Sequence, residues 1–166
     1  MSISDFLMAL QNTPIAGAVR GDPGYEWMFP IVEIFHVFSL TLVFGSIAMV
    51  DMRLLGLASR DSAVSKLSAE VLPWTWSAWV FSAISGSLLF MSKAHTYFYN
   101  AQFEAKFVLM ALAAVNMAVF QFGIYRRVLD WDNQLPPPPA ARVAGALSLM
   151  LWIGVIFCGR WTGFTT

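Results

Sequence analysis

Four apolar segments dominate this sequence of 166 residues, at about residues 28–50, 71–91, 103–125 and 143–161. Each is long enough to cross a hydrocarbon layer about 30 Å thick, which takes about 20 residues of α-helix. Lipid offers no water to backbone amides and carbonyls, so a spanning segment must be a helix or part of a closed barrel. The segments lack the alternating pattern of a barrel strand. We therefore predict an all-α fold, a four-helix transmembrane bundle that forms a single integral membrane domain over residues 1–166.

The composition supports a membrane protein and excludes several other classes. Hydrophobic residues make up 58% of the chain and charged residues 12%, against about 25% charged in a typical soluble domain. This balance excludes a disordered chain and an ordinary soluble enzyme. The net charge of zero provides no basic surface for nucleic acid, so we expect the lipid bilayer as the main partner. The single cysteine, Cys158, excludes an internal disulfide and a cysteine-held iron–sulfur cluster within this chain.

The N-terminal segment, residues 3–20, is not expected to be a secretory signal, because it lacks a basic start. Its first part carries one apolar stripe at helical spacing, which predicts an amphipathic helix lying in the membrane interface: Ile3, Phe6, Leu7 and Leu10. Thr13 followed by Pro14 is typical of a helix cap and a first helical residue, so a second short helix is expected there. Residues 21–24 then form a turn.

The distribution of Lys and Arg predicts the orientation of the chain. The loops after the first and third spans carry six of them, and the opposite side carries four. Positive residues accumulate in cytoplasmic loops, so this modest excess predicts that the loops after the first and third spans are cytoplasmic and that both termini lie on the opposite side of the membrane.

Ionisable residues converge on one membrane face. His36 lies about two turns into the first span, and Glu33 lies on the same helix face. Since successive spans run in opposite directions, the end of the second span, the start of the third and the end of the fourth return to this side. They bring with them His95, Lys106 and Arg160. Such residues are costly inside a membrane and usually have a function.

Haem b is the cofactor that this combination of residues suits best. Its iron takes axial imidazoles, so His36 is the expected ligand and His95 the expected second ligand, with Met91 or Met110 as alternative thioether ligands. A histidine within a membrane can instead serve as a hydrogen-bonded link between helices. Two histidines allow at most one bis-histidine haem in this chain.

The remaining candidates would hold the rest of the cofactor. Lys106 and Arg160 would bind the propionates, unless they only extend toward lipid headgroups, and Glu33 would orient His36. Small residues at 82, 85 and 86 could admit a flat ring. Aromatic side chains are expected to form the walls: Phe35, Phe38, Phe90 and Phe107.

Other polar residues have structural interpretations. We expect Asn100 to cap a helix and Asn116 to form a hydrogen bond between helices. Asp51, Arg53 and Arg142 are expected to form ion pairs at the membrane surface.

Several motifs along the chain have a familiar arrangement. They are Phe29-Pro30, Glu33, His36, Gly45, residues 51–56, residues 72–74, Asn100, Phe103, Lys106, residues 148–152 and residues 159–161. Together they resemble a family of small bacterial inner-membrane proteins known only as a domain of unknown function. The resemblance covers nearly the whole chain and implies no established activity.

A more distant resemblance concerns the histidine in the first span, the glycine and Arg-Leu near its end, and the lysine in a later span. In these features the chain is similar to HemJ-type protoporphyrinogen oxidases and to CopD-type copper-resistance membrane proteins. The HemJ resemblance implies that His36 and Lys106 are functional and that haem is bound. The chain departs from the HemJ pattern in its long interfacial N-terminus and in the Trp- and Pro-rich start of its second span.

Three functional hypotheses follow. The first is a membrane haem b protein that transfers electrons at the periplasmic face, with quinone or a periplasmic redox protein as partner and within a larger complex or homo-oligomer. The second is a HemJ-like porphyrin-oxidising enzyme. The third is a non-haem structural or assembly subunit whose histidines only brace helices.

Overall fold

The computed structural model describes residues 2–133 and 136–165, and within these ranges all regular structure is helical. This confirms the predicted all-α class. The elements, in chain order, are α1 (Ile3–Gln11), α2 (Pro14–Arg20), α3 (Met28–Leu54), α4 (Val64–Ser92), α5 (Ala94–Phe98), α6 (Ala101–Val119), the π-helical turn η1 (Phe120–Ile124), the 3-10 turn η2 (Tyr125–Arg127), α7 (Val128–Trp131) and α8 (Pro139–Thr162).

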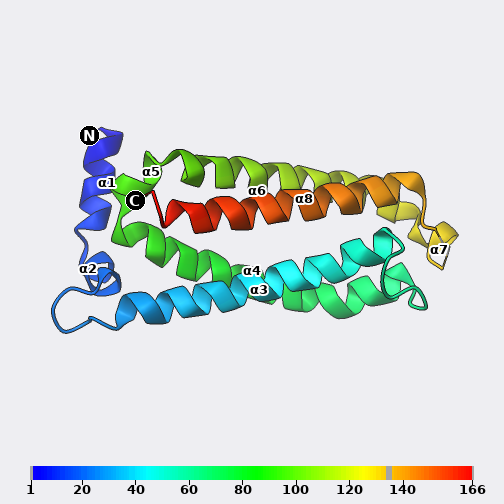
Figure 1. Ribbon diagram of the computed structural model, residues 1–166, viewed down its shortest axis with the longest axis horizontal. Coiled ribbons are helices and arrows are strands. Elements are labelled where there is room, and N and C mark those ends of the chain that lie inside the picture. The colour runs from blue at the N-terminus through cyan, green and yellow to red at the C-terminus, as the bar shows by residue number, and fades with distance from the viewer. Residues whose placement is uncertain (1, 134–135, 166) are drawn as a thin grey trace.

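The long helices α3, α4, α6 and α8 lie side by side and alternate in direction (Figure 1). They form two closely packed pairs, α3 with α4 and α6 with α8. The pairs are joined mainly through α3 and α8, whereas α4 and α6 hardly touch. The short helices α1 and α2 lie across one end of the long helices, and both chain termini are at this end (Figure 1). The first residues of α3 and α6 and the last residues of α4 and α8 therefore share one end of the molecule.

Three helical stretches are long and apolar enough to cross a membrane: Met28–Leu54, Ala101–Trp131 and Pro139–Thr162. The chain is thus a membrane protein. Helix α4 has 29 residues but is less apolar, because serine, threonine and tryptophan are frequent in it.

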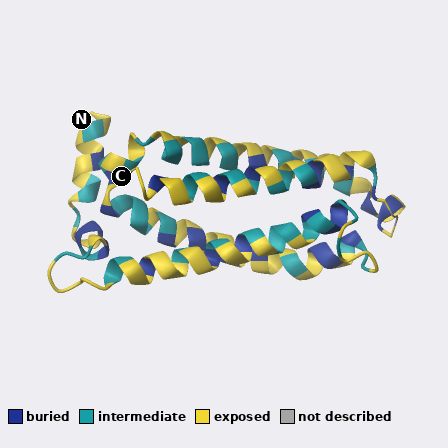
Figure 2. Ribbon diagram, viewed as in Figure 1, coloured by how far each residue is buried: buried dark blue, intermediate teal, exposed yellow. Residues whose placement is uncertain are grey.

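Figure 2 shows many exposed positions along the long helices, and these include large apolar residues, whereas the buried positions include small polar ones. Phe38, Phe81 and Phe122 are each about two-thirds exposed or more, at 68%, 67% and 71%. Ser39, Thr75, Ser82 and Ser85 are buried between α3 and α4. An apolar outer surface on this scale belongs in contact with lipid, and small polar residues let helices approach closely within it.

The helix boundaries refine the predicted spans in two places. Helix α4 begins at Val64, earlier than expected, and continues through Pro73. The third predicted span ends in irregular turns, since the α-helix stops at Val119 and a π-helical turn follows. Such turns shift the register of a helix and bend it.

The N-terminal caps form as predicted. The Thr13 hydroxyl accepts a hydrogen bond from the Ala16 amide, with Pro14 as the first helical residue. Gly21 ends α2 with a φ of +91°, a left-handed conformation that glycine adopts at little cost.

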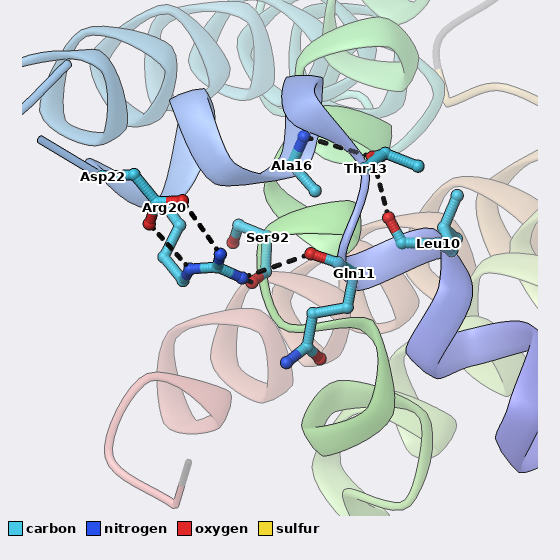
Figure 3. Close-up of polar contacts among 7 residues, drawn as sticks. All are labelled: Leu10, Gln11, Thr13, Ala16, Arg20, Asp22 and Ser92. Carbon is cyan, nitrogen blue, oxygen red and sulfur yellow. Dashed lines mark hydrogen bonds and ion pairs between the residues drawn. The ribbon is translucent and has the colours of Figure 1, made fainter. Parts of the chain in front are cut away.

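Arg20 fastens these short helices to the end of α4 (Figure 3). Its guanidinium forms an ion pair with Asp22 at 3.1 Å and donates to the carbonyls of Gln11 and Ser92. One side chain thus connects α1, α2 and the last residue of α4.

Two predicted side-chain roles are also confirmed. Asn100 caps α6, since its Oδ1 accepts hydrogen bonds from the amides of Gln102 and Phe103. Asn116 donates from Nδ2 to the carbonyl of Ala144 at 3.0 Å, which links α6 to α8.

The predicted surface ion pair between Asp51 and Arg53 is wrong, because both residues are buried, at 5% and 0% exposure. The Arg53 guanidinium donates to the carbonyls of Ser62 and Asp132, at 2.7 and 3.1 Å. Among the residues that the structure describes, none forms a hydrogen bond with Oδ2 of Asp51 or Nη1 of Arg53. Arg53 therefore organises the loop that follows α3 and does not anchor the helix at the membrane surface. Arg142, by contrast, is exposed.

Candidate functional site

A cavity of about 650 Å³ lies between the α3–α4 pair and the α6–α8 pair. Its volume falls within the range of small-molecule and cofactor sites, about 300–1,000 Å³. The walls are mostly apolar and aromatic, with a few polar or ionisable groups. The lining residues from α3 and α4 are His36, Leu40, Val43, Trp79, Ser82, Ala83, Gly86, Ser87 and Phe90, and those from α5, α6 and α8 are Phe98, Phe103, Glu104, Lys106, Phe107, Met110, Trp152 and Val155.

His36 projects from α3 toward α4 and is fixed there by two neighbours. Its Nδ1 lies 3.0 Å from the hydroxyl oxygen of Ser85. Its ring lies against Gly86, where an added Cβ would come within 2.9 Å of the His36 Cε1 atom. The small residues at 85 and 86 were predicted to admit a flat ring, and the ring that they accommodate in this structure is the imidazole of His36.

The hydrogen bonds of Ser85 determine which imidazole nitrogen carries the proton. The Ser85 hydroxyl donates to a carbonyl of its own helix, at 2.7 Å from that of Phe81. A hydroxyl has one proton, so its oxygen acts as acceptor toward His36. Nδ1 is then the protonated nitrogen, and Nε2 keeps its lone pair. This is the form in which a histidine binds a metal.

Lys106 is the cationic group of the cavity. It lies in the second turn of α6, and its side chain runs past Gly159 on α8, where an added Cβ would be 3.9 Å from Nζ. Lys106 and His36 both line the cavity. The predicted convergence of the first and third spans on one site is therefore present.

Phe103 forms the aromatic end of the cavity. Its ring stacks on Phe90 of α4, with centroids 5.4 Å apart, and on Tyr97 of α5, at 5.8 Å. It also contacts Phe107 edge to face at 4.9 Å. Burial, reinforced by the negative charge of Glu33, raises the pKa of the Tyr97 phenol, so this phenol stays neutral.

Three of the predicted site residues lie outside the cavity. His95 is on α5, where its ring packs against Tyr99 at 5.2 Å and its amide donates to Oε1 of Gln11. Arg160 is exposed and lies over the ring of Phe164, 5.1 Å from its centroid. Glu33 is exposed at the start of α3.

The predicted aromatic walls are only half correct. Phe90 and Phe107 line the cavity. Phe35 and Phe38 are 66% and 68% exposed and point outward, because they lie on the face of α3 that is turned away from the other helices. Met110 lines the cavity, whereas Met91 does not.

Several lining residues were missed by the sequence reasoning, among them Trp79, Glu104 and Trp152. A signal existed for Trp79, because positions 79, 83, 86 and 90 follow helical spacing around Gly86, as positions 103, 106, 107 and 110 do around Lys106. Each set marks one face of its helix.

The donor set limits what could be bound. Within residues 2–133 and 136–165, no group of three or more His, Cys, Asp or Glu side chains is arranged to hold a metal ion. A metal bound at His36 would therefore need most of its ligands from a cofactor. The cavity suits a largely apolar molecule that carries a metal or hydrogen-bonding centre for His36 and an anionic group for Lys106.

Comparison with known proteins identifies the family but no activity. No curated protein and no solved structure matches the chain significantly. A match to a described family extends over residues 25–165, from the segment before α3 to the C-terminus. The chain therefore belongs to the family of unknown function DUF6644.

Proposed function

We propose that this protein is a membrane haem b protein that transfers electrons, with the haem in the cavity between the two helix pairs. His36 would be the axial ligand, and Lys106 would bind a propionate. The observation that carries the proposal is the presence of both side chains in one apolar cavity of about 650 Å³. Haem b, when bound, supplies one-electron redox chemistry.

The chain's own residues have defined tasks in this proposal. The Ser85 hydroxyl oxygen accepts a hydrogen bond from Nδ1–H of His36, so Nε2 remains available as the ligand atom. Gly86 provides the space in which the imidazole ring lies. The aromatic and aliphatic walls exclude water, which strengthens the pairing between Lys106 and a carboxylate. Ligand identity, burial and charge pairing are the means by which a protein sets the potential of a haem.

The proposal includes a topology in which α4 is the fourth span. Its 29 residues match the length of its partner α3, and the two pack together along their lengths. With loops one and three in the cytoplasm, the end that carries α1 and α2 faces the periplasm of a bacterial inner membrane. Lys106, in the second turn of α6, then lies near that face, where quinone or a periplasmic redox protein would exchange electrons. Further membrane subunits or a second copy would extend the path across the bilayer.

The position of His95 favours a second candidate, a porphyrin-oxidising enzyme of the HemJ kind. His95 lies on α5, away from the cavity, so His36 is the histidine that faces a ligand there. An iron with one protein ligand keeps a position for a reactant, unless Met110 occupies it. Complementation of a bacterial strain that lacks porphyrin oxidation distinguishes the enzyme from the electron carrier.

The proposal is tested by titrating purified protein with haem and comparing two single-histidine variants. We expect His36→Ala to lose the Soret shift that accompanies ligation, because the axial imidazole is gone. His95→Ala is the matched control and should retain the wild-type spectrum, since its ring packs against Tyr99. Equal spectra for wild type and His36→Ala would contradict the proposal, and loss of the shift in His95→Ala alone would move the ligand to α5.

A further inference from the structure

The cavity has one closed side and one open side. On the closed side, α3 and α8 are in contact, and the lining residues Val43 and Val155 are 1% and 2% exposed. On the open side, the backbones of α4 and α6 stay apart, and the two helices meet through the stacked rings of Phe90 and Phe103. The lining residues that flank this seam are exposed: Ala83 and Ser87 on α4, and Glu104 and Phe107 on α6.

The open seam is bordered by the apolar outer surface of the helices. Next to it on α4 lies Ile84, which is 57% exposed, and on α6 lies Val108, at 59%. A surface of this kind contacts acyl chains. The seam between α4 and α6 therefore faces lipid over the depth of the cavity.

The charged groups of the cavity lie toward the end of the bundle that carries α1 and α2. Glu104 and Lys106 lie in the first two turns of α6, whereas Met110 lies a turn or more deeper. Val43 and Trp152 line the deeper part from α3 and α8. An amphiphile in the same leaflet is oriented in the same way, with its polar head at the membrane surface and its apolar body deeper.

We propose that the cavity is filled sideways from the bilayer, through the seam between α4 and α6, by a membrane-dissolved amphiphile with an anionic head and a broad apolar body. Such a molecule reaches Lys106 and His36 without turning over and without crossing water. The nature of this ligand rests on the proposed function, since a tetrapyrrole with propionates fits the description. The route itself depends only on the shape of the protein.

The route is tested without any ligand, by labelling a cysteine on the closed wall of the cavity. The protein is reconstituted in lipid vesicles with Cys158→Ser, to remove the native thiol, and Val155→Cys. We expect a lipid-dissolved pyrene maleimide to label this thiol at least about tenfold faster than a charged maleimide sulfonate, because charged reagents are excluded from hydrocarbon. Val155 is 2% exposed, so labelling requires passage through the cavity.

Two tryptophan variants on α4 locate the opening. Ser87→Trp places a large ring at the seam and should slow labelling by the pyrene reagent about tenfold. Phe81→Trp is the matched control, because Phe81 is 67% exposed on another face of the same helix and does not line the cavity, and it should leave the rate unchanged.

Three results would overturn the lateral route: faster labelling by the charged reagent, equal rates in the two tryptophan variants, or protection of the thiol from both reagents. The last would mean that another chain covers the seam. The labelling assay contains no haem. If the haem titration gave no Soret shift, the proposed cofactor would be rejected, and the labelling result would still stand. Conversely, if labelling showed that the seam is closed, the haem titration of the His36→Ala variant would still test the proposed function.

Discussion

The ring of His36 on α3 lies against Gly86 on α4, so closely that a Cβ at position 86 would come within 2.9 Å of the His36 Cε1 atom. The contact joins the two helices at the height of the cavity. It also explains why a glycine occurs at this point of α4, because any larger residue would displace the imidazole.

Gly86→Ala should therefore destabilise the protein and disturb the His36 site. We expect a loss of about 1–3 kcal/mol, typical of overpacking, as measured by thermal unfolding in detergent. Gly45→Ala is the matched control, since no atom lies within 4 Å of the Cβ that would be added, and its effect should stay within about 0.5 kcal/mol. Equal stability of the two variants would show that His36 moves aside without cost.

Ser85→Ala should remove the preference of the His36 imidazole for a proton on Nδ1. The variant removes the oxygen that accepts from Nδ1, at a cost of about 1 kcal/mol. Nitrogen-15 NMR of labelled imidazole should show a protonated Nδ1 in the wild type and a mixture of tautomers in the variant. Ser77→Ala is the control, because that hydroxyl is exposed and bonds the carbonyl of Pro73. A wild-type tautomer in Ser85→Ala would mean that Ser85 does not determine it.

Lys106→Ala should weaken the binding of haem by about tenfold to a hundredfold, the usual effect of losing a charged hydrogen bond of about 1.5–3 kcal/mol. Lys106→Arg should keep most of the affinity, and the exposed Lys93→Ala should not change it. The decisive comparison uses the dimethyl ester of haem, whose propionates carry no charge. If Lys106→Ala weakens the ester as much as the free acid, Lys106 does not act on a carboxylate.

Arg53→Ala should destabilise the opposite end of the bundle by about 2–4 kcal/mol, because the carbonyls of the half-buried Ser62 and the buried Asp132 lose their hydrogen bonds from the guanidinium. Haem binding by the folded fraction should be unaffected, since the cavity lies elsewhere. Arg60→Ala is the matched control, as this exposed arginine donates to the nearby carbonyl of Gly56, and it should cost less than about 0.5 kcal/mol. Similar melting temperatures for both variants would contradict the structural role of Arg53.

Much of the fold could be predicted from sequence because membrane helices obey a simple rule of length and apolarity. The convergence of His36 and Lys106 followed from alternating helix direction alone, and both line the cavity. The caps at Thr13 and Asn100 could be predicted because they depend on neighbouring residues.

The remaining details depend on how each helix is rotated about its axis. Phe35 and His36 are adjacent in sequence, but one points to lipid and the other to the cavity, and their own helix is apolar on all sides. His95 lies on the short helix α5 and packs against Tyr99 outside the cavity lining, and the positions of the predicted spans do not indicate this helix. The burial of Asp51 and Arg53 depends on α7 and the loops, whose packing leaves no periodic pattern in the sequence.

The most direct test of the central claim is the absorption spectrum of the protein purified from haem-replete bacterial membranes, recorded before and after addition of dithionite. The account predicts a Soret band and α and β bands that sharpen on reduction in the wild type, and their loss in His36→Ala. A wild-type protein without a Soret band, or a His36→Ala variant with the same reduced spectrum as the wild type, would contradict it.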